Sequence, residues 1–213
     1  MDGKELPKKL ATGTTTMALI CSDGVVVGAD TRATAGSFIA HTEARKVFKI
    51  DNNLAMTIAG GVGDAQELIR IIKAQNEVYK MNEGRPLSPR SAASLMAIIL
   101  QQNKGFPFYV ELIVTGLDGD VPQLFDLDPF GGSAEQSRFT ASGSGSYVAL
   151  GYLEDMYKKG ITTKEAVRGV ARALQLAMKR DSATGNGMTI ATITKAGYTE
   201  YNEKDLEKIL AAK

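Results

Sequence analysis

Hydrophobic positions along the chain follow two patterns, and each pattern recurs in blocks. Residues 15–21 (TTMALIC) and 25–30 (VVVGAD) are short apolar runs rich in β-branched side chains. The turn segment 22–24 joins them, so this part of the chain predicts a β-hairpin. From residue 62 to 81, apolar side chains recur instead at three- and four-residue spacing, which predicts an amphipathic helix.

Strands and helices are therefore expected in groups rather than in strict alternation. The predicted strands span residues 15–21, 25–30, 46–50, 54–59, 109–117, 123–127, 138–141 and 188–194. The predicted helices span residues 62–81, 88–102, 147–158, 163–180 and 203–211. This grouping favours an α+β fold, a four-layer αββα sandwich with antiparallel sheets between helix pairs. We expect a single domain over residues 14–213, preceded by a polar extension of residues 1–13.

Composition and charge exclude several classes of protein. The 213 residues are 44% hydrophobic and 23% charged, and 25 Lys plus Arg balance 24 Asp plus Glu for a net charge of +1. That balance argues against a partner held by bulk charge, so neither nucleic acid nor a membrane is expected. The longest apolar stretch, 92–100, is shorter than a membrane span, and residues 1–13 lack the apolar core of a secretory signal. We expect a cytoplasmic protein.

The rarest residue types narrow the possible chemistry. His41 is the single histidine and Cys21 the single cysteine, which excludes an internal disulfide and a metal site built from several His or Cys ligands. We expect neither a metal nor a cofactor. A Ser-His-Asp or Cys-His mechanism would depend on His41 alone, whose neighbours FIAHTEARK indicate a solvated loop. Cys21 ends an apolar run and is expected to be a buried, unreactive thiol.

The segment Gly13-Thr14-Thr15-Thr16 lies where the polar extension meets the first strand. A threonine cluster at a strand start is common, because threonine has a high strand propensity. A threonine hydroxyl becomes an effective nucleophile only with a base beside it. A chain cut before a threonine supplies that base as a new α-amino group, whose unperturbed pKa is about 7.7–8.0. At this level the segment fits both a plain strand start and a nucleophile.

Asp30 and Lys46 are charged residues at the ends of apolar strands. Asp30 closes the run VVVGAD, and Lys46 opens the run KVFKI, 16 positions further along the chain. If both face one cleft, they can pair and place a cation beside a hydroxyl, where the cation favours the alkoxide. The alternative is an ordinary surface ion pair.

Two glycine-rich segments could present backbone N–H groups to an anion. Segment 59–64 (AGGVGD) lies where a strand is expected to lead into a helix, and segment 143–146 (GSGS) precedes another predicted helix. The first could hold an oxyanion or a phosphate. However, it lacks GKS or GKT, only approximates GxGxxG, and carries Asp64, which would repel a phosphate. The second segment fits a flexible turn or an anion-binding nest.

Six segments together resemble the proteasome β subunit family. They are GTTT, GADTRAT, EARKVFKID, TIAGGVGDAQ, TASGSGS and KRDSATG, and they occur in the family's order with near-constant spacing. The chain is most similar to the archaeal type, within the N-terminal-nucleophile hydrolases, and the resemblance covers essentially everything from Gly13 onward. The bacterial two-component relative is similar around GTTT, but it is shorter and fits the later segments less well. The family's αββα sandwich agrees with the fold expected above.

The resemblance implies a threonine endopeptidase that activates itself. Residues 1–13 would be a propeptide, removed by autocatalytic cleavage between Gly13 and Thr14. Thr14 would then be the nucleophile, with its own amine as the proton shuttle. Lys46 would be the cation beside the Thr14 hydroxyl and would be held by Asp30.

Four more positions would complete the catalytic set by the same resemblance. Gly60 would donate its backbone N–H to the oxyanion. Ser144, Asp181 and Thr184 would surround and orient the new N-terminus. The family more often has serine where this chain has Thr184, and threonine keeps the hydroxyl but adds a methyl group.

The resemblance also implies where the residue before the scissile bond would bind. That pocket would be lined by Ala33, Ala44, Ile58, Val62 and Gln66. None of these side chains is charged, so a charged substrate residue would be desolvated without a partner, and cleavage is expected after hydrophobic residues. Arg32 and Glu43 flank two of these positions, and either could turn inward and add a charge.

The implied assembly is a seven-membered ring formed with other β subunits. This ring would stack against rings of proteasome α subunits, and a regulatory ATPase would act through the α ring on unfolded protein substrates. Two alternatives stay open. One is a β-type ring subunit with a structural assembly role and no cleavage activity, and the other is a nucleotide-binding module built on segment 59–64.

Overall fold

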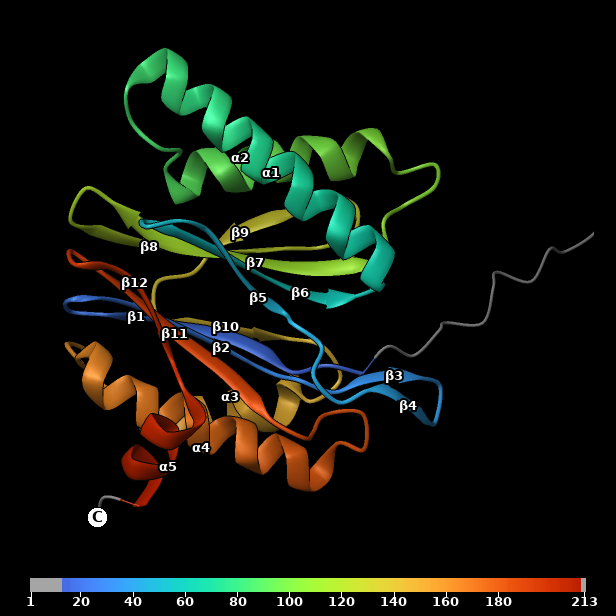
Figure 1. The fold of residues 1–213 in the computed structure, drawn as a ribbon, viewed down its shortest axis with the longest axis vertical. Helices are drawn as coiled ribbons and strands as arrows, with labels where there is room; N and C mark the ends of the chain where they lie inside the picture. The colour runs from blue at the N-terminus through green and yellow to red at the C-terminus, as the bar shows by residue number, and fades with distance from the viewer. Residues whose placement is uncertain (1–12, 212–213) are drawn as a thin grey trace, which may run out of the picture.

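The protein folds into four layers in the computed structural model, which describes residues 13–211 (Figure 1). The upper helix layer contains α1 (Val62–Glu83) and α2 (Pro89–Gln102). Beneath it lies a sheet with the order β5 (Val47–Asp51), β6 (Leu54–Gly60), β7 (Val110–Asp118), β8 (Val121–Leu127) and β9 (Ser133–Glu135). The second sheet has the order β10 (Phe139–Ser142), β1 (Thr16–Cys21), β2 (Gly24–Asp30), β11 (Met188–Thr194) and β12 (Gly197–Tyr201). The lower helix layer contains α3 (Ser146–Met156) and α4 (Thr163–Arg180), with α5 (Glu203–Ala211) beside α4.

Every neighbouring pair of strands within the two large sheets is antiparallel. This arrangement confirms the αββα sandwich expected from the grouping of strands and helices. The hairpin expected around segment 22–24 is confirmed as well, because β1 pairs with β2 and Cys21 lies opposite Gly24.

Strand β2 explains why a continuous apolar run can be a strand. Its side chains alternate between two faces, and both faces are buried. Val26 packs into the cluster between its sheet and the lower helices, whereas Val25, Val27 and Ala29 pack into the cluster between the two sheets. A strand in this position has no polar face, so the sequence shows no alternation there.

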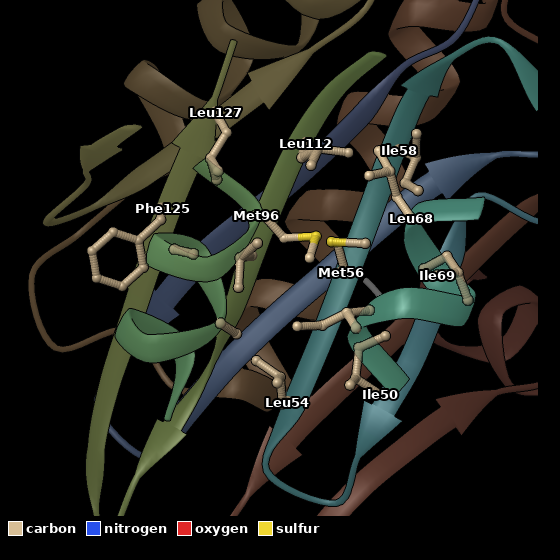
Figure 2. Close-up of a cluster of buried hydrophobic side chains, with 14 of the residues drawn as sticks. Ile50, Leu54, Met56, Ile58, Leu68, Ile69, Met96, Leu112, Phe125 and Leu127 are labelled. Atoms are coloured by element: carbon tan, nitrogen blue, oxygen red, sulfur yellow. The ribbon is translucent and has the colours of Figure 1, made fainter. Parts of the chain in front are cut away.

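The upper helices are held to their sheet by a third apolar cluster, shown in Figure 2. Met56 on β6 and Met96 on α2 point toward one another at its centre, and both are almost fully buried. Leu68 and Ile69 of α1 and Leu112 of β7 pack around them. Because the sheet is sandwiched in this way, the ends of its strands are firmly positioned at the edge of the molecule.

The structure contains short strands that the hydrophobic pattern did not predict. Strands β3 (Ala33–Ala35) and β4 (Phe38–His41) form a small hairpin that projects at the right of Figure 1. His41 is exposed as expected, but it lies on β4 and not in a loop. The edge strands β9 and β12 were also missed. Strand β9 is exposed throughout, and β12 is half-buried to exposed and carries no apolar run.

Two details of the lower layer agree with the sequence. The hydroxyl of Thr162 accepts a hydrogen bond from the Glu165 N–H and forms a capping box at the start of α4, so the helix begins at Thr163 as expected. Cys21 is buried, and burial raises the pKa of its thiol to about 12.

Within residues 13–211, no helix is long and apolar enough to cross a membrane.

Candidate active site

The ends of four strand segments meet at one edge of the sandwich. Thr14 lies two residues before β1, Asp30 ends β2, Lys46 lies immediately before β5, and Gly60 ends β6. Thr14, Lys46 and Gly60 line a cleft of about 630 Å³, together with Gly13. The fold therefore brings together residues that are up to 46 positions apart in the chain.

The Asp30 carboxylate is the buried centre of this edge, with 1% of the residue exposed. Its Oδ1 accepts from Lys46 Nζ at 2.7 Å and from the Thr15 N–H at 2.9 Å. Its Oδ2 accepts from the Arg32 and Gly185 N–H groups, both at 3.0 Å. Four donors compensate the burial of the charge, which is the condition under which a buried ion pair is tolerated. The surface ion pair considered from the sequence is thus a buried one.

Lys46 is also buried, and its ammonium is held in a low-polarity setting. Burial lowers the pKa of the amine from its ordinary value, and the neighbouring Asp30 carboxylate opposes part of that shift. The pKa of Lys46 therefore lies below that of a surface lysine.

Thr14 is almost fully buried, with 3% of the residue exposed, and its hydroxyl lies against the preceding peptide bond. Thr14 Oγ1 donates to the Gly13 carbonyl oxygen at 2.6 Å. The Gly13 N–H is fixed in turn by Thr34 Oγ1 at 3.0 Å. A Cβ atom at position 13 would lie 1.6 Å from the Cβ of Ala183, so only glycine fits before Thr14.

A second group of polar side chains, separate from the Asp30–Lys46 pair, surrounds the Thr14 nitrogen. Ser144 lies just before α3, Asp181 is the C-cap of α4, and Thr184 lies in the loop that leads to β11. The Thr14 N–H donates to Ser144 Oγ at 3.2 Å. Ser144 Oγ and Thr184 Oγ1 both donate to Asp181 Oδ2 at 2.5 Å. The extra methyl group of threonine at position 184 does not prevent this contact.

Sequence reasoning missed one participant, Thr15. Its hydroxyl lies 2.7 Å from Thr184 Oγ1 and its N–H binds Asp30. The only signal available was its place within the GTTT cluster, which does not distinguish it from Thr14 or Thr16.

Gly60 supports the close approach of two strand ends. Its φ of 140° is a conformation that favours glycine, and a Cβ there would lie 2.0 Å from the Tyr109 carbonyl oxygen. The following helix begins at Val62 with Gly61 as its N-cap. Asp64 in its first turn accepts from the Tyr109 N–H at 2.7 Å, so a carboxylate already lies where a phosphate would approach.

All five residues expected to bind the substrate side chain line the same cleft as Thr14. They are Ala33, Ala44, Ile58, Val62 and Gln66. The cleft is larger than this set, since Ile39, His41 and Phe48 line it as well. Of the two flanking charges, Arg32 is turned to the loop carbonyl of Ser182, whereas Glu43 lines the cleft.

The comparisons with known proteins agree with this geometry. A model of the proteasome subunit family matches residues 10–193. A proteasome subunit beta of Methanococcus vannielii is 46% identical over 211 residues, which cover 99% of this chain and 96% of the relative. The proteasome subunit beta of Methanosphaerula palustris is 44% identical over 200 residues, covering 94% and 95%, and that of Methanocaldococcus fervens is 45% identical over 199 residues, covering 93% and 89%.

The αββα sandwich with its cleft at the strand ends is the fold of the N-terminal-nucleophile hydrolases. Within that class, the chain belongs to the proteasome subunit family and is of the β type. The family is one of protein-degrading hydrolases, so the chain is a protease subunit in this general sense.

Proposed function

We propose that the protein is a threonine endopeptidase whose nucleophile is Thr14, released by self-cleavage after Gly13. The observation that carries the proposal is the buried Thr14 hydroxyl, 2.6 Å from the Gly13 carbonyl oxygen in a cleft that also contains Lys46. A structural ring subunit has no need of a buried Asp30–Lys46 pair beside a threonine. Residues 1–12 of the proposed propeptide lie outside the described part of the chain.

Self-cleavage begins with attack of Thr14 Oγ1 on the carbonyl carbon of Gly13. A C–O bond forms, the C–N bond between the two residues breaks, and the hydroxyl proton ends on the departing nitrogen. Water then hydrolyses the resulting ester, which leaves a carboxylate on Gly13 and a free amine on Thr14. The steric need for glycine at position 13 supports this step, because a side chain there would collide with Ala183 and displace the peptide bond to be cut.

Peptide cleavage repeats the chemistry on a bound substrate. Thr14 Oγ1 attacks the substrate carbonyl carbon while its proton passes to the free amine of Thr14. The amine returns this proton to the leaving nitrogen as the peptide C–N bond breaks, and water hydrolyses the acyl ester. The Lys46 ammonium lowers the cost of charge on the Thr14 oxygen. The Gly60 N–H is the proposed donor to the substrate oxyanion, and Ser144, Asp181 and Thr184 orient the amine.

The lining of the cleft supports cleavage after hydrophobic residues. Ala33, Ala44, Ile58 and Val62 are small or apolar. Burial of a Leu or Phe side chain gains about 1.5–3 kcal/mol, whereas an unpaired charge would lose its hydration. Glu43 at the cleft could favour a basic residue, so the comparison of Phe and Arg substrates is the sharper test.

The relatives are proteasome β subunits, so we propose assembly into a proteasome core with α subunits. The same proposal includes a seven-membered β ring and a regulatory ATPase that acts through the α ring. It also includes unfolded proteins as substrates and a cytoplasmic location.

The Thr14→Ala variant tests the mechanism directly. After assembly with the α-type partner, intact-mass measurement should show loss of residues 1–13 from the wild type and retention of them in the variant. Peptide hydrolysis should fall at least about 1,000-fold, because no other group replaces the nucleophile. Thr199→Ala, an exposed threonine on β12, is the matched control and should behave as wild type. An active Thr14→Ala variant would overturn the proposal, and an inactive wild type in normal rings would favour the structural subunit.

Fluorogenic peptides test specificity separately. Hydrolysis after Leu, Phe or Tyr should exceed hydrolysis after Arg or Glu by at least about tenfold in kcat/KM. Equal or higher values for Arg or Glu would show that the pocket has been misassigned, even if the role of Thr14 holds. A saturable thermal shift with ATP would instead favour the nucleotide-binding alternative.

A further inference from the structure

We propose that Thr15 is a positioning residue that joins the two halves of the site on either side of Thr14. The inference rests on the proposed threonine endopeptidase function. Its basis is that Thr15 contacts both halves: its N–H binds Asp30, the partner of Lys46, and its hydroxyl binds Thr184, the partner of Asp181.

The direction of the hydrogen bonds that join Thr15, Thr184 and Asp181 follows from the number of protons that each group can donate. A hydroxyl has one proton to donate. Thr184 Oγ1 gives its proton to Asp181 Oδ2 at 2.5 Å, so at its 2.7 Å contact with Thr15 Oγ1 it can only accept. Thr15 therefore donates to Thr184, and Thr184 donates to Asp181. Hydrogen bonds in such a chain polarise one another, which strengthens the bond to the carboxylate.

The same carboxylate oxygen fixes the residue that touches Thr14. Ser144 Oγ gives its proton to Asp181 Oδ2 at 2.5 Å, and its lone pair then faces the Thr14 N–H at 3.2 Å. Asp181 Oδ1 accepts from the Ala183 N–H at 3.2 Å, so a second contact limits rotation of the carboxylate. A change at Thr15 thus reaches the Thr14 nitrogen through four successive hydrogen bonds, by way of Thr184, Asp181 and Ser144.

The backbone of Thr15 is equally constrained. Its N–H donates to Asp30 Oδ1 at 2.9 Å, and its carbonyl oxygen accepts from the Asp30 N–H at 3.1 Å. This reciprocal pair aligns Thr15 against the carboxylate that holds Lys46. The backbone of Thr15 therefore cannot shift without disturbing the charged half of the site.

Packing keeps water away from the Thr15 hydroxyl. The residue is fully buried, and a Cβ at Gly145 would lie 2.0 Å from Thr15 Oγ1 and 3.0 Å from Thr184 Oγ1. The backbone at Gly145 thus covers the hydroxyl pair. If the Thr15 hydroxyl is removed, no water can enter to replace it, and the acceptor site of Thr184 is left empty.

Thr15→Val is the decisive variant, since it keeps the shape of the side chain and removes only the donor. In assembled particles, with activity normalised to the fraction of free Thr14 N-terminus by intact mass, we expect kcat to fall about 5- to 20-fold with KM within twofold. Thr15→Ser retains the hydroxyl and should restore kcat to within about twofold of wild type.

Thr16→Val provides the matched control. Thr16 follows Thr15 as the first residue of β1 and is equally buried. Its hydroxyl bonds to Ser142 Oγ at 2.8 Å, outside the hydrogen-bond chain that leads to Asp181. It should lose as much Tm as Thr15→Val while its kcat stays within twofold of wild type.

The outcomes separate this inference from the proposed function. Equal kcat values in Thr15→Val and Thr16→Val, or failure of Thr15→Ser to restore kcat, would overturn the positioning role while Thr14→Ala remains inactive. An active Thr14→Ala variant would overturn the proposed function itself. If Thr15→Val does not fold, the smaller Thr15→Ala variant replaces it under the same criteria.

Discussion

The two halves of the site on either side of Thr14 are built in opposite ways. Asp30 and Lys46 form one ion pair, and both residues are at least nine-tenths buried. On the other side, Ser144 is exposed and Asp181 is half-buried. The first half uses opposite charges held by strand ends, whereas the second uses hydroxyl groups around one carboxylate at loop and helix ends.

The difference predicts which half tolerates change. A buried charge depends on its partner, because removal of one member leaves the other desolvated and unpaired. An exposed hydroxyl can be replaced in part by water. We therefore expect changes in the charged half to abolish nearly all activity, and a change at the exposed Ser144 to reduce activity only in part. The fully buried hydroxyl of Thr184 lacks this access to water.

The largest effect is expected from Lys46→Ala. Without the Lys46 ammonium, no cation stabilises the negative charge that develops on Thr14 Oγ1. Peptide hydrolysis should therefore fall at least about 100-fold. Lys49→Ala, a change at an exposed lysine on the same strand, should leave the rate unchanged. Lys46→Arg should not restore activity, since a planar guanidinium does not replace a compact ammonium in a filled site. Near-wild-type hydrolysis by Lys46→Arg would contradict the role assigned to Lys46.

An intermediate effect is expected from Ser144→Ala. The Thr14 nitrogen loses an acceptor, but water has access to this exposed position, so kcat should fall about tenfold and Tm should change little. Ser182→Ala, another exposed serine near Asp181, serves as the control. If Ser144→Ala lowers the rate of peptide hydrolysis as much as Lys46→Ala does, the expected contrast between the two halves of the site is wrong.

The smallest effect concerns the dependence of stability on pH. The pKa of Lys46 is lower in the folded chain than its ordinary value of 10.5. Between the folded pKa and 10.5, the unfolded state therefore binds more protons, and this residue makes the free energy of unfolding rise with pH. Urea unfolding at several pH values up to about 10.5 should show a steeper rise for wild type than for Lys46→Met. Parallel curves would indicate that burial does not lower the pKa.

Much of the fold could be predicted from hydrophobic pattern alone. The hairpin of β1 and β2 and the helices α1, α2 and α4 were expected within a few residues, because each buries a continuous apolar run or stripe. The exposed β3–β4 hairpin and the edge strand β12 were missed, since backbone pairing and not side-chain burial defines them.

The residues of the candidate site also differ in whether the local sequence identifies them. Asp30 and Lys46 were identifiable as charges at the ends of apolar strands, and Thr14 as part of a threonine cluster. Ser144, Asp181 and Thr184 have no such local mark and were named only through family resemblance. Thr15 was identified neither from the local sequence pattern nor from the family resemblance, because its role depends on the direction in which one hydroxyl donates.

Hydrophobic pattern and composition alone give the order of the buried strands and the helices, the balance of charge and the residue types that can carry the chemistry. These properties are local, since burial periodicity and turn residues act over a few positions. Three further features follow from packing between distant segments: the burial of the Asp30–Lys46 pair, the contact of Thr14 with the Gly13 carbonyl, and the contacts of Thr15 with Asp30 and Thr184. Burial, pKa and hydrogen-bond direction depend on neighbours from distant parts of the chain, which only the folded sandwich brings within contact distance.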